Sequence, residues 1–528
     1  MSGRMFKSTV IVGANTLLSR VLGLVRDIII ARLFGAGSGT DAFFVAFKIP
    51  NFFRRLFAEG AFSQAFIPVL AETRVADGDK HDQTQHLVVH TAGTLGGILV
   101  ILTLLAELSA PWLIILFGPG FYLEGGERYE LTVQMLRITF PYLLLISLTG
   151  LAGAVLNSFG RFAVAAFTPV LLNLSLIGAA IWLAPLTDVP VVALAWGVLI
   201  AGLVQLAFQL PFLARLGVLG RPRWGWADSG VRKIMQLMLP VIIGSSVLQI
   251  NLVIDTIIAS FLITGSVTWL YYADRMVEFP LGVFAIALST VILPSLSRQH
   301  AEDDPESFST TMDWALRLAV IIGLPATVGL FMLAGPIITG LFQYGDFGSQ
   351  DVDMAALALM AYAIGLPAFI LIKVLAPGYF ARQDTRTPVR IAIKAMFVNI
   401  ALNLLFVVPM VYYGLNGPHA GLALATGLAA WVNALLLWRG LRRSEVYTPK
   451  SGWGTLLIQV SVSLLVMIAV LVFGIAEQYQ WSSWDWTQRL SQLGIWILLA
   501  GAAYLFALVL CGLRPSHLRS ARPEQKNS

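Results

Sequence analysis

The stretch at residues 9–33, TVIVGANTLLSRVLGLVRDIIIARL, decides the class of fold. It is long enough to cross a hydrocarbon core as an α-helix, which takes about 20 mostly apolar residues. It nevertheless contains Arg20, Arg26 and Arg32, with only Asp27 to offset them. Charges are costly inside a bilayer, so such a helix indicates a membrane span that faces something other than lipid on part of its surface.

Apolar runs of similar length recur along almost the whole chain of 528 residues. We expect fourteen spans, near 9–33, 42–70, 87–117, 131–157, 164–184, 190–213, 234–262, 270–296, 313–340, 355–380, 388–411, 418–438, 455–475 and 490–513. In the second span, Pro50 and Gly60 are expected to break the helix. The predicted fold class is therefore an all-α polytopic membrane protein with 14 transmembrane helices.

Composition supports this class. Only 12% of the residues are charged and 57% are hydrophobic, whereas soluble proteins contain about 25% charged residues, so a soluble protein is excluded. The single cysteine, Cys511, excludes a disulfide framework and a cysteine-based metal site. Nearly all Lys and Arg residues between the predicted spans fall on one side of the membrane, and the other side holds only Arg128. The positive-inside rule then predicts an inner or plasma membrane protein with cytoplasmic N- and C-termini.

The chain also contains a weak internal repeat. Residues 10–15 (VIVGAN) reappear as 241–246 (VIIGSS), and 47–50 (FKIP) as 277–280 (VEFP). We therefore predict two six-helix lobes around a central cavity. The predicted domains are 1–225, the N-terminal lobe; 226–445, the C-terminal lobe; and 446–528, two additional helices with a cytoplasmic tail. Repeats related by an axis along the membrane normal place a substrate site between them near the midplane.

The most informative charges lie inside the spans. A charge at the bilayer centre costs roughly 2.5–3.5 kcal/mol on insertion scales, so it normally faces a partner or a wet cavity. We expect Arg20, Arg26 and Arg54 to face such a cavity, with Arg275 as the contribution of the second lobe. Arginines near span ends can instead extend to the interface, and four belong to this group: Arg32, Arg137, Arg317 and Arg489.

Two charged pairs have the spacing of neighbours on one helix face. They are Arg55 with Glu59 at i, i+4 and Arg275 with Glu278 at i, i+3. One interpretation is a mutual ion pair with a structural role. The other is that these side chains belong to the basic cavity, in which case Arg55, Glu59 and Glu278 are functionally sensitive.

A separate set of polar residues suits a cation. Asn251 and Asp255 are four residues apart in one span, as are Asn399 and Asn403 in another. Carboxylate and amide oxygens suit Na⁺ or another hard cation, although interhelical hydrogen bonding explains membrane asparagines equally well. The glycine-rich run at 35–39 has neither a Walker lysine nor GxGxxG spacing and is expected to form a tight turn. We found no catalytic motif, so the sequence predicts a transporter and not an enzyme.

Several motifs resemble one family, the MurJ (MviN) lipid II flippases of the multidrug/oligosaccharidyl-lipid/polysaccharide exporter superfamily. They are SRVLGLVRD at 19–27, FGAG at 34–37, TDAFFVAFKIPN at 40–51, RRLFAEGAFSQAF at 54–66, YYADRMVEFP at 271–280 and LAPGY at 375–379. The resemblance extends over about residues 1–515.

The resemblance implies roles for particular residues. Arg20, Arg26, Arg54 and Arg275 match cavity arginines that are important for flipping, and Asp41 and Glu59 match functionally sensitive acids. Some members bind Na⁺, which the resemblance maps onto four residues: Asp255, Asn399, Asn403 and Thr426. The last two helices of the family form a lipid-facing groove for the undecaprenyl tail, here 455–475 and 490–513.

The predicted function is therefore export of lipid II, the undecaprenyl-pyrophosphate-linked peptidoglycan precursor, from the inner to the outer leaflet. We expect alternating access driven by the membrane potential, an ion gradient or both. No cofactor other than Na⁺ is expected. The expected partners are lipid II, membrane lipids and the cell-wall synthesis machinery, with no nucleic acid, and the carrier is expected to be a monomer.

Two other functions stay open at this stage. One is a cation-coupled exporter of drugs or of other polyprenyl-linked oligosaccharides in the same superfamily. The other is a membrane enzyme acting on polyprenyl phosphates.

Overall fold

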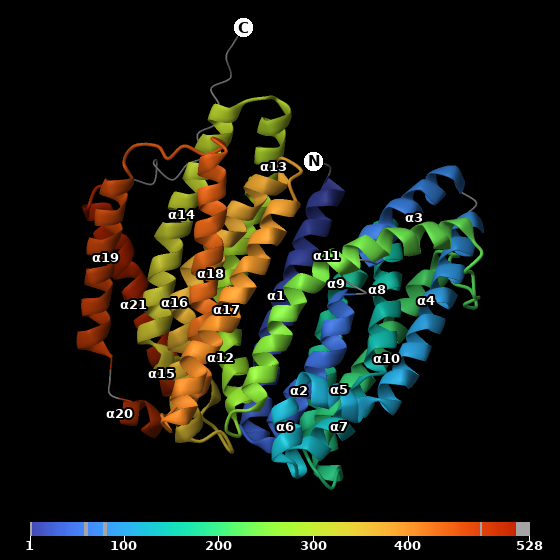
Figure 1. Cartoon of the computed structure of the whole chain (residues 1–528), viewed down its shortest axis with the longest axis horizontal. Helices are drawn as coiled ribbons and strands as arrows, with labels where there is room; N and C mark the ends of the chain where they lie inside the picture. Colours follow the sequence, from blue (N-terminus) through green and yellow to red (C-terminus); the bar gives the residue numbers. More distant parts are fainter. Residues whose placement is uncertain (1–2, 57–61, 78–81, 476–477, 514–528) are drawn as a thin grey trace. The chain divides into compact units, whose positions relative to one another are not determined.

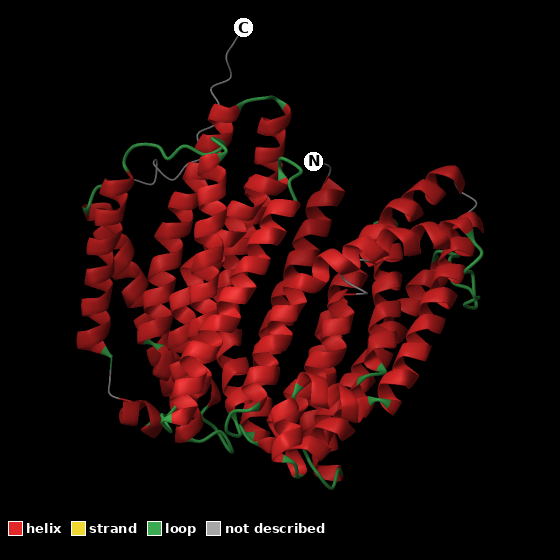
Figure 2. Cartoon of the chain, viewed as in Figure 1, coloured by secondary structure: helices red, strands yellow, loops and turns green. Residues whose placement is uncertain are grey.

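The computed structural model describes residues 3–56, 62–77, 82–475 and 478–513. Within these ranges the chain is helical with connecting loops and contains no β-strand (Figure 2). It divides into two compact units, Met1–Thr268 (unit 1) and Trp269–Ser528 (unit 2). This division rests on packing. The predicted lobe boundaries at 225 and 445 rest on the internal repeat, and they stay a prediction.

Unit 1 consists of helices from α1 to α11 and the first turn of α12 (Figure 1). The bounds are α1 (Gly3–Phe34), α2 (Ser38–Arg54), α3 (Ser63–Asp77), α4 (Asp82–Leu108), α5 (Ala110–Phe117), α6 (Pro119–Glu124), α7 (Glu127–Thr139), α8 (Tyr142–Ser158), α9 (Phe162–Gly178), the short turns η2 (Ala179–Leu183) and η3 (Ala184–Leu186), α10 (Val192–Arg215) and α11 (Ser229–Ser260). Helix α1 packs along α9, α2 along α7, and α10 against both α8 and α9.

Unit 2 consists of the rest of α12 and the helices that follow it. The bounds are α12 (Ser266–Pro280), η4 (Leu281–Ala285), α13 (Ile286–Ala301), α14 (Pro305–Met332), α15 (Ala334–Phe342), α16 (Ser349–Phe380), α17 (Arg386–Tyr412), α18 (Pro418–Arg443), α19 (Trp453–Gly474), α20 (Gln478–Ser483) and α21 (Trp486–Leu510). Its centre is α16, which packs against α14 and α18, and α17 also packs against α18.

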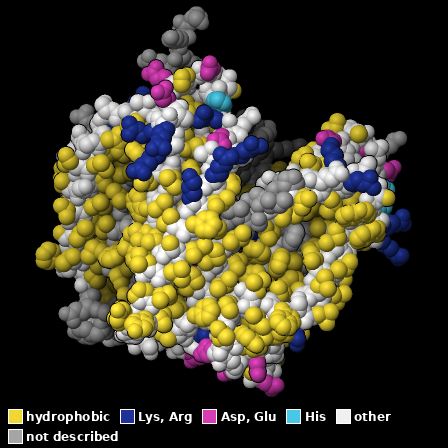
Figure 3. All heavy atoms as spheres, in the orientation of Figure 1, with side chains coloured by type: hydrophobic (Ala, Val, Ile, Leu, Met, Phe, Trp, Pro, Cys, Tyr) yellow, Lys and Arg dark blue, Asp and Glu magenta, His cyan; other side chains and the backbone are white. Residues whose placement is uncertain are grey.

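Small residues allow two helix backbones of unit 2 to approach closely. A Cβ atom added to Gly365 of α16 would lie 2.5 Å from the Cα atom of Gly427 on α18. The backbones therefore meet directly, which is how membrane helices gain packing energy where lipid offers no hydrophobic driving force. Figure 3 shows, on the face drawn of each unit, a broad band of hydrophobic side chains between polar ends.

Eleven helices or helix pairs in the described residues are long and apolar enough to cross a membrane. The protein is thus a multi-pass membrane protein, and the exact number of fourteen spans stays a prediction. Predicted spans 9–33 and 234–262 lie in α1 and α11, each of 32 residues. A helix of that length extends about 48 Å, which exceeds the hydrocarbon core.

The predicted span 42–70 contains two described helices. Helix α2 ends at Arg54, four residues after Pro50, and α3 begins at Ser63. Residues 57–61, which include Gly60, lie outside the described residues, so the predicted break at Pro50 and Gly60 stays a prediction. The chain turns between α1 and α2 at Gly35, which has a φ of 60°, as the glycine-rich run predicts.

Candidate functional site

Two neighbouring charged residues of α1, Arg26 and Asp27, are buried. Arg26 is 8% exposed and Asp27 is fully buried. The guanidinium of Arg26 donates to Asp27 Oδ1 through Nε (2.9 Å) and Nη2 (2.6 Å), and to Asn173 Oδ1 on α9 through Nη1 (3.1 Å). Asn173 in turn donates to the carbonyl oxygen of Ser19 (2.9 Å). This network joins α1 to α9 and offsets the cost of a buried charge.

Arg20 lies nearly two turns earlier on α1 and is half-buried. Among the described residues it has no hydrogen-bond or ion-pair partner. All five of its N–H donors are therefore available to a ligand anion, because a guanidinium donates only and stays charged.

The end of α2 adds a second group of basic residues in unit 1. Arg54 is half-buried and donates from Nε to Asn51 Oδ1 (3.0 Å), while Arg55 is exposed. Lys48, six residues before Arg54 on α2, donates to the Thr256 hydroxyl on α11 (3.3 Å). The predicted partner of Arg55, Glu59, lies outside the described residues.

Arg275 belongs to α12 in unit 2. Its Nη1 donates to Glu278 Oε2 at 3.2 Å, and the Arg275 side chain is 32% exposed. The predicted pair is therefore confirmed. At this exposure the pair contributes little to stability, so it can exchange for another anion at low cost. Arg20, Arg26 and Arg54 belong to unit 1, and Arg275 belongs to unit 2.

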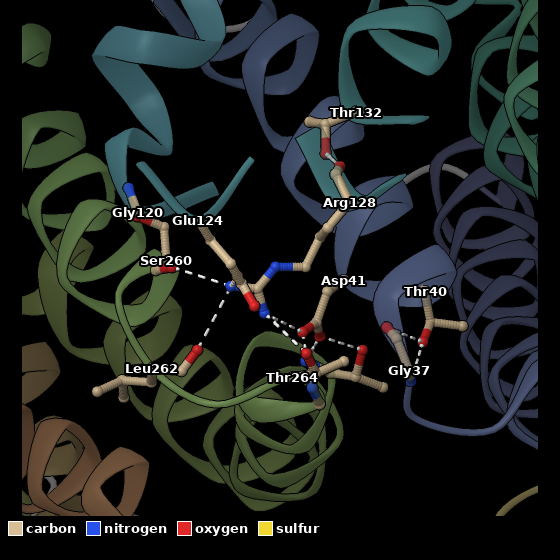
Figure 4. Close-up of polar contacts among 12 residues, drawn as sticks. Gly37, Thr40, Asp41, Gly120, Glu124, Arg128, Thr132, Ser260, Leu262 and Thr264 are labelled. Carbon is tan, nitrogen blue, oxygen red and sulfur yellow. Dashed lines mark hydrogen bonds and ion pairs between the residues drawn. The ribbon is translucent and has the colours of Figure 1, made fainter. Parts of the chain in front are cut away.

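The predicted functional acid Asp41 is the centre of a buried cluster at one end of unit 1 (Figure 4). Its Oδ2 accepts from the Gly265 N–H (2.7 Å), and its Oδ1 accepts from the N–H (2.9 Å) and the hydroxyl (2.7 Å) of Thr268. Arg128 Nη1 lies 3.7 Å from Asp41 Oδ2. We call Asp41, Arg128, Gly265 and Thr268 the Arg128 cluster. It ties the start of α2 to the turn between α11 and α12.

Arg128 also binds the end of α11. Its Nη2 donates to the carbonyl oxygens of Ser260 (3.2 Å) and Leu262 (3.5 Å), and it pairs with Glu124 at 2.6 Å. The C-terminal carbonyls of a helix are the negative end of its dipole, so a cation there is favoured. Gly120 of α6 lets the end of α11 pack closely against α6, because a Cβ atom at that position would lie 2.2 Å from the Ser260 carbonyl oxygen.

Sequence reasoning missed the role of Arg128. It placed this residue in an outer segment between spans and gave it no partner, whereas Arg128 lies in α7 and its side chain is only 5% exposed. The available signal was its isolation: Arg128 is the one basic residue on a side whose other charges are acidic.

The predicted cation ligands belong to both units. Asn399 and Asn403 of α17 are 1% and 0% exposed, and Thr426 lies on the adjacent helix α18. Asp255 lies on α11 in unit 1 and is half-buried. No group of three or more His, Cys, Asp or Glu side chains in the described ranges could hold a metal ion. An amide-rich Na⁺ site therefore stays a prediction.

Within unit 2, the C-terminal helices α19 and α21 are held against the other helices, first at the end where α19 begins. Asp313 of α14 is 3% exposed. Its Oδ1 accepts from the Tyr447 hydroxyl (2.8 Å) and Trp453 Nε1 (2.8 Å), and its Oδ2 accepts from Arg317 Nε (2.7 Å). One carboxylate thus holds the connection between α18 and α19 against α14.

The opposite end of the pair is held by Arg489. This residue donates to the carbonyl oxygens of Thr339 (3.2 Å) and Gln343 (2.8 Å) at the end of α15. Its side chain is 6% exposed, so the expectation that it extends to the interface is wrong, because these carbonyls bind it. Between the two ends, the Tyr504 hydroxyl donates to the Ile321 carbonyl oxygen (2.8 Å). Arg32 and Arg137 are exposed, as expected.

Comparisons with known proteins agree on one family. Residues 30–490 match the family model described as lipid II flippase MurJ. The chain is 49% identical to a probable lipid II flippase MurJ of Vibrio cholerae, over 99% of each chain. It is 46% identical to the Haemophilus influenzae protein of the same name, over 95% of this chain and 99% of the relative.

Solved structures give the same result. A lipid II flippase MurJ in an inward closed conformation matches with a TM-score of 0.77 and 26% identity, over 95% of this chain and 98% of that one. An inward-facing multidrug resistance transporter of the MATE family matches with a TM-score of 0.61 and 17% identity, over 83% of this chain and 98% of that one. The second likeness concerns the fold alone.

Proposed function

The chain belongs to the family of MurJ lipid II flippases, and from this premise we propose how it moves lipid II from the inner to the outer leaflet. It is a transporter and not an enzyme. The proposed substrate site is formed by Arg20, Arg26 and Arg54 of unit 1 together with Arg275 of unit 2. Alternating access of this site to the two sides of the membrane would move the headgroup while the undecaprenyl tail stays in lipid.

The observation that supports this site best is the state of Arg20. It is a half-buried arginine in an apolar helix, with no polar partner among the described residues. Such a charge is costly in a membrane unless something anionic binds it. Guanidinium groups bind pyrophosphate oxygens with paired, charge-assisted hydrogen bonds, which suits the diphosphate of lipid II.

The orientation follows from the basic loops. In the predicted fourteen-span topology, Lys and Arg between the spans lie almost entirely on the side of the N- and C-termini, and we propose that this side is cytoplasmic. The cytoplasm is electrically negative. Outward movement of an anionic headgroup is then favoured by about 2.3 kcal/mol per charge for each 100 mV, so the potential can drive export without ATP.

The Arg128 cluster has a proposed role in the same cycle. Its acceptor Asp41 lies in the first turn of α2, which ends at Arg54, and its donor Thr268 lies in the first turn of α12, which contains Arg275. A change of conformation that separates α2 from the α11–α12 turn has to break these bonds. We assign the cluster to the closed state of the outer side, a role that would account for the functional sensitivity predicted for Asp41.

Ion coupling is a second element of the proposal. Asp255, Asn399, Asn403 and Thr426 offer a carboxylate, two amide oxygens and a hydroxyl, a donor set that suits Na⁺. Bound Na⁺ would contribute to resetting the carrier after release of lipid II. We further propose a monomeric carrier.

The test uses cells in which the chromosomal gene is depleted and a plasmid supplies a variant. A lipid II-degrading enzyme is added from outside, and the fraction of lipid II that it cleaves is measured. We expect Arg20→Ala to leave most lipid II protected, and Arg32→Ala, an exposed arginine of the same helix, to behave as the unchanged protein does. Cleavage in Arg20→Ala cells at the level of the control would show that the assigned site is wrong. Full cleavage after depletion without any plasmid would exclude the flippase function itself.

A further inference from the structure

An open groove on the surface of unit 1 is unrelated to the sites described above. It has a volume of about 440 Å³ and lies between α7 and the start of α5. Its lining residues are Pro111, Tyr129, Glu130, Val133, Gln134, Arg137 and Ile138. The opposite face of α7, which includes Arg128, Leu131 and Met135, is buried. The groove is therefore on the face of α7 that does not pack against the rest of unit 1.

The groove contains one charge of each sign. Glu130 and Arg137 are both exposed, and neither side chain has a hydrogen-bond or ion-pair partner among the described residues. They are seven residues apart, so their Cα atoms are about 10 Å apart along the helix axis on the same face. Side chains on a helix point toward its N-terminus, so each charged group lies on the groove face, on the N-terminal side of its own Cα atom. Gln134 and Tyr129 add polar groups between and beside them.

The surroundings of the groove are those of a membrane interface. Trp112, next to Pro111, is 72% exposed, and Tyr122 is 49% exposed with its ring 5.4 Å from that of Tyr129. Exposed Trp and Tyr side chains gather at the level of lipid headgroups. Val133 and Ile138 give the groove apolar walls. These neighbours suit a lipid headgroup, and Arg137 is the side chain of the groove whose charge suits a lipid phosphate.

We propose that this groove binds the headgroup of phosphatidylethanolamine. The phosphate lies against Arg137, with Gln134 and Tyr129 as further donors, and the primary ammonium lies against Glu130. A zwitterionic headgroup matches a groove with one cationic and one anionic side chain, whereas an anionic headgroup would meet Glu130 without a compensating charge. The proposed orientation of the chain places this lipid in the outer leaflet, and the binding site itself does not depend on the proposed transport function.

The test is native mass spectrometry of the delipidated full-length protein titrated with phosphatidylethanolamine, phosphatidylglycerol or phosphatidylcholine. Arg137→Gln is expected to weaken the tightest phosphatidylethanolamine binding about fivefold, and to weaken phosphatidylglycerol binding as well. Glu130→Gln is expected to weaken phosphatidylethanolamine only. Glu127→Gln, an exposed acid on the same helix outside the groove, is the matched control and should change neither.

Three results would overturn the proposal. The first is equal phosphatidylethanolamine binding by the unchanged protein, Arg137→Gln and Glu130→Gln. The second is a preference of the unchanged protein for phosphatidylglycerol. The third is displacement of the lipid by inorganic phosphate, which would indicate a site for a soluble anion. All three substituted side chains are exposed, and gel filtration confirms that each variant is folded.

Discussion

Replacing Arg128 with Met is the sharpest test of the cluster around Asp41. The substitution keeps a long unbranched side chain but removes every donor. In the present structure those donors reach Asp41, Glu124, Thr264 and the carbonyl oxygens at the end of α11. If the cluster fixes α2 to the α11–α12 turn, its loss should destabilise unit 1 far more than an ordinary surface substitution.

The expected magnitude follows from burial. Removal of one partner of a buried ion pair costs about 3–5 kcal/mol. Asp41 retains its hydrogen bonds from Gly265 and Thr268, and its distance to Arg128 is 3.7 Å, so we expect the lower end, about 3 kcal/mol. Glu124 is 54% exposed, and its pair with Arg128 contributes about 0–1 kcal/mol. Glu124→Gln is therefore the matched control.

The assay is unfolding of the purified full-length protein in mixed micelles, followed by tryptophan fluorescence at one fixed rate of denaturant addition. A double-mutant cycle with Asp41→Asn isolates the pair. The cycle should give a coupling free energy of about 1–2 kcal/mol, since Asn at position 41 leaves no buried charge to compensate. If Arg128→Met is no less stable than Glu124→Gln, or if the cycle gives no coupling, the cluster does not hold these elements together.

Three further outcomes follow from the structure. Gly427→Leu should prevent folding of unit 2, because the added side chain would overlap α16 at Gly365, and gel filtration should detect aggregated protein, whereas Gly454→Ala, with open space at that position, should stay monodisperse. Asp313→Ala should destabilise the protein by about 2–4 kcal/mol, since it leaves Arg317, Tyr447 and Trp453 without their common acceptor; unfolding in mixed micelles measures this, and a loss under about 1 kcal/mol would contradict it. Asn403→Ala should abolish any stimulation of lipid II export by Na⁺ relative to K⁺ in the external-enzyme assay, and unchanged stimulation would remove Asn403 from the proposed ligand set.

The sequence predicted the class of fold because membrane spans obey a strong local rule. Apolar runs of the right length must be helical, since no other lone segment satisfies its backbone in lipid. The turn between α1 and α2 was also local, since it follows from a single residue, Gly35. The number of separate helices was harder: α14 and α15 are divided at Leu333, just before Gly335 and Pro336, whereas the predicted span 313–340 runs through this break.

The sequence could not predict which arginines are structural. Arg128 and Arg489 are bound by backbone carbonyls at the ends of α11 and α15, which are 132 and 150 residues away in the chain. Every residue has a backbone carbonyl oxygen, so the sequence does not show which of them will accept a hydrogen bond from an arginine. Only the packing of the helices decides that these two side chains meet helix ends while Arg32 stays exposed.

The same distinction separates two arginines that the sequence treats alike. The donors of Arg26 already bind Asp27 and Asn173, and Asp27 is fully buried. A diphosphate at Arg26 must therefore compete with the Asp27 carboxylate. Removal of Arg26 leaves that carboxylate buried without the guanidinium that compensates its charge. A transport defect in an Arg26 variant thus combines lost binding with lost stability. Arg20 lacks a polar partner in the described part of the chain, so the defect of an Arg20 variant reports on the anion alone.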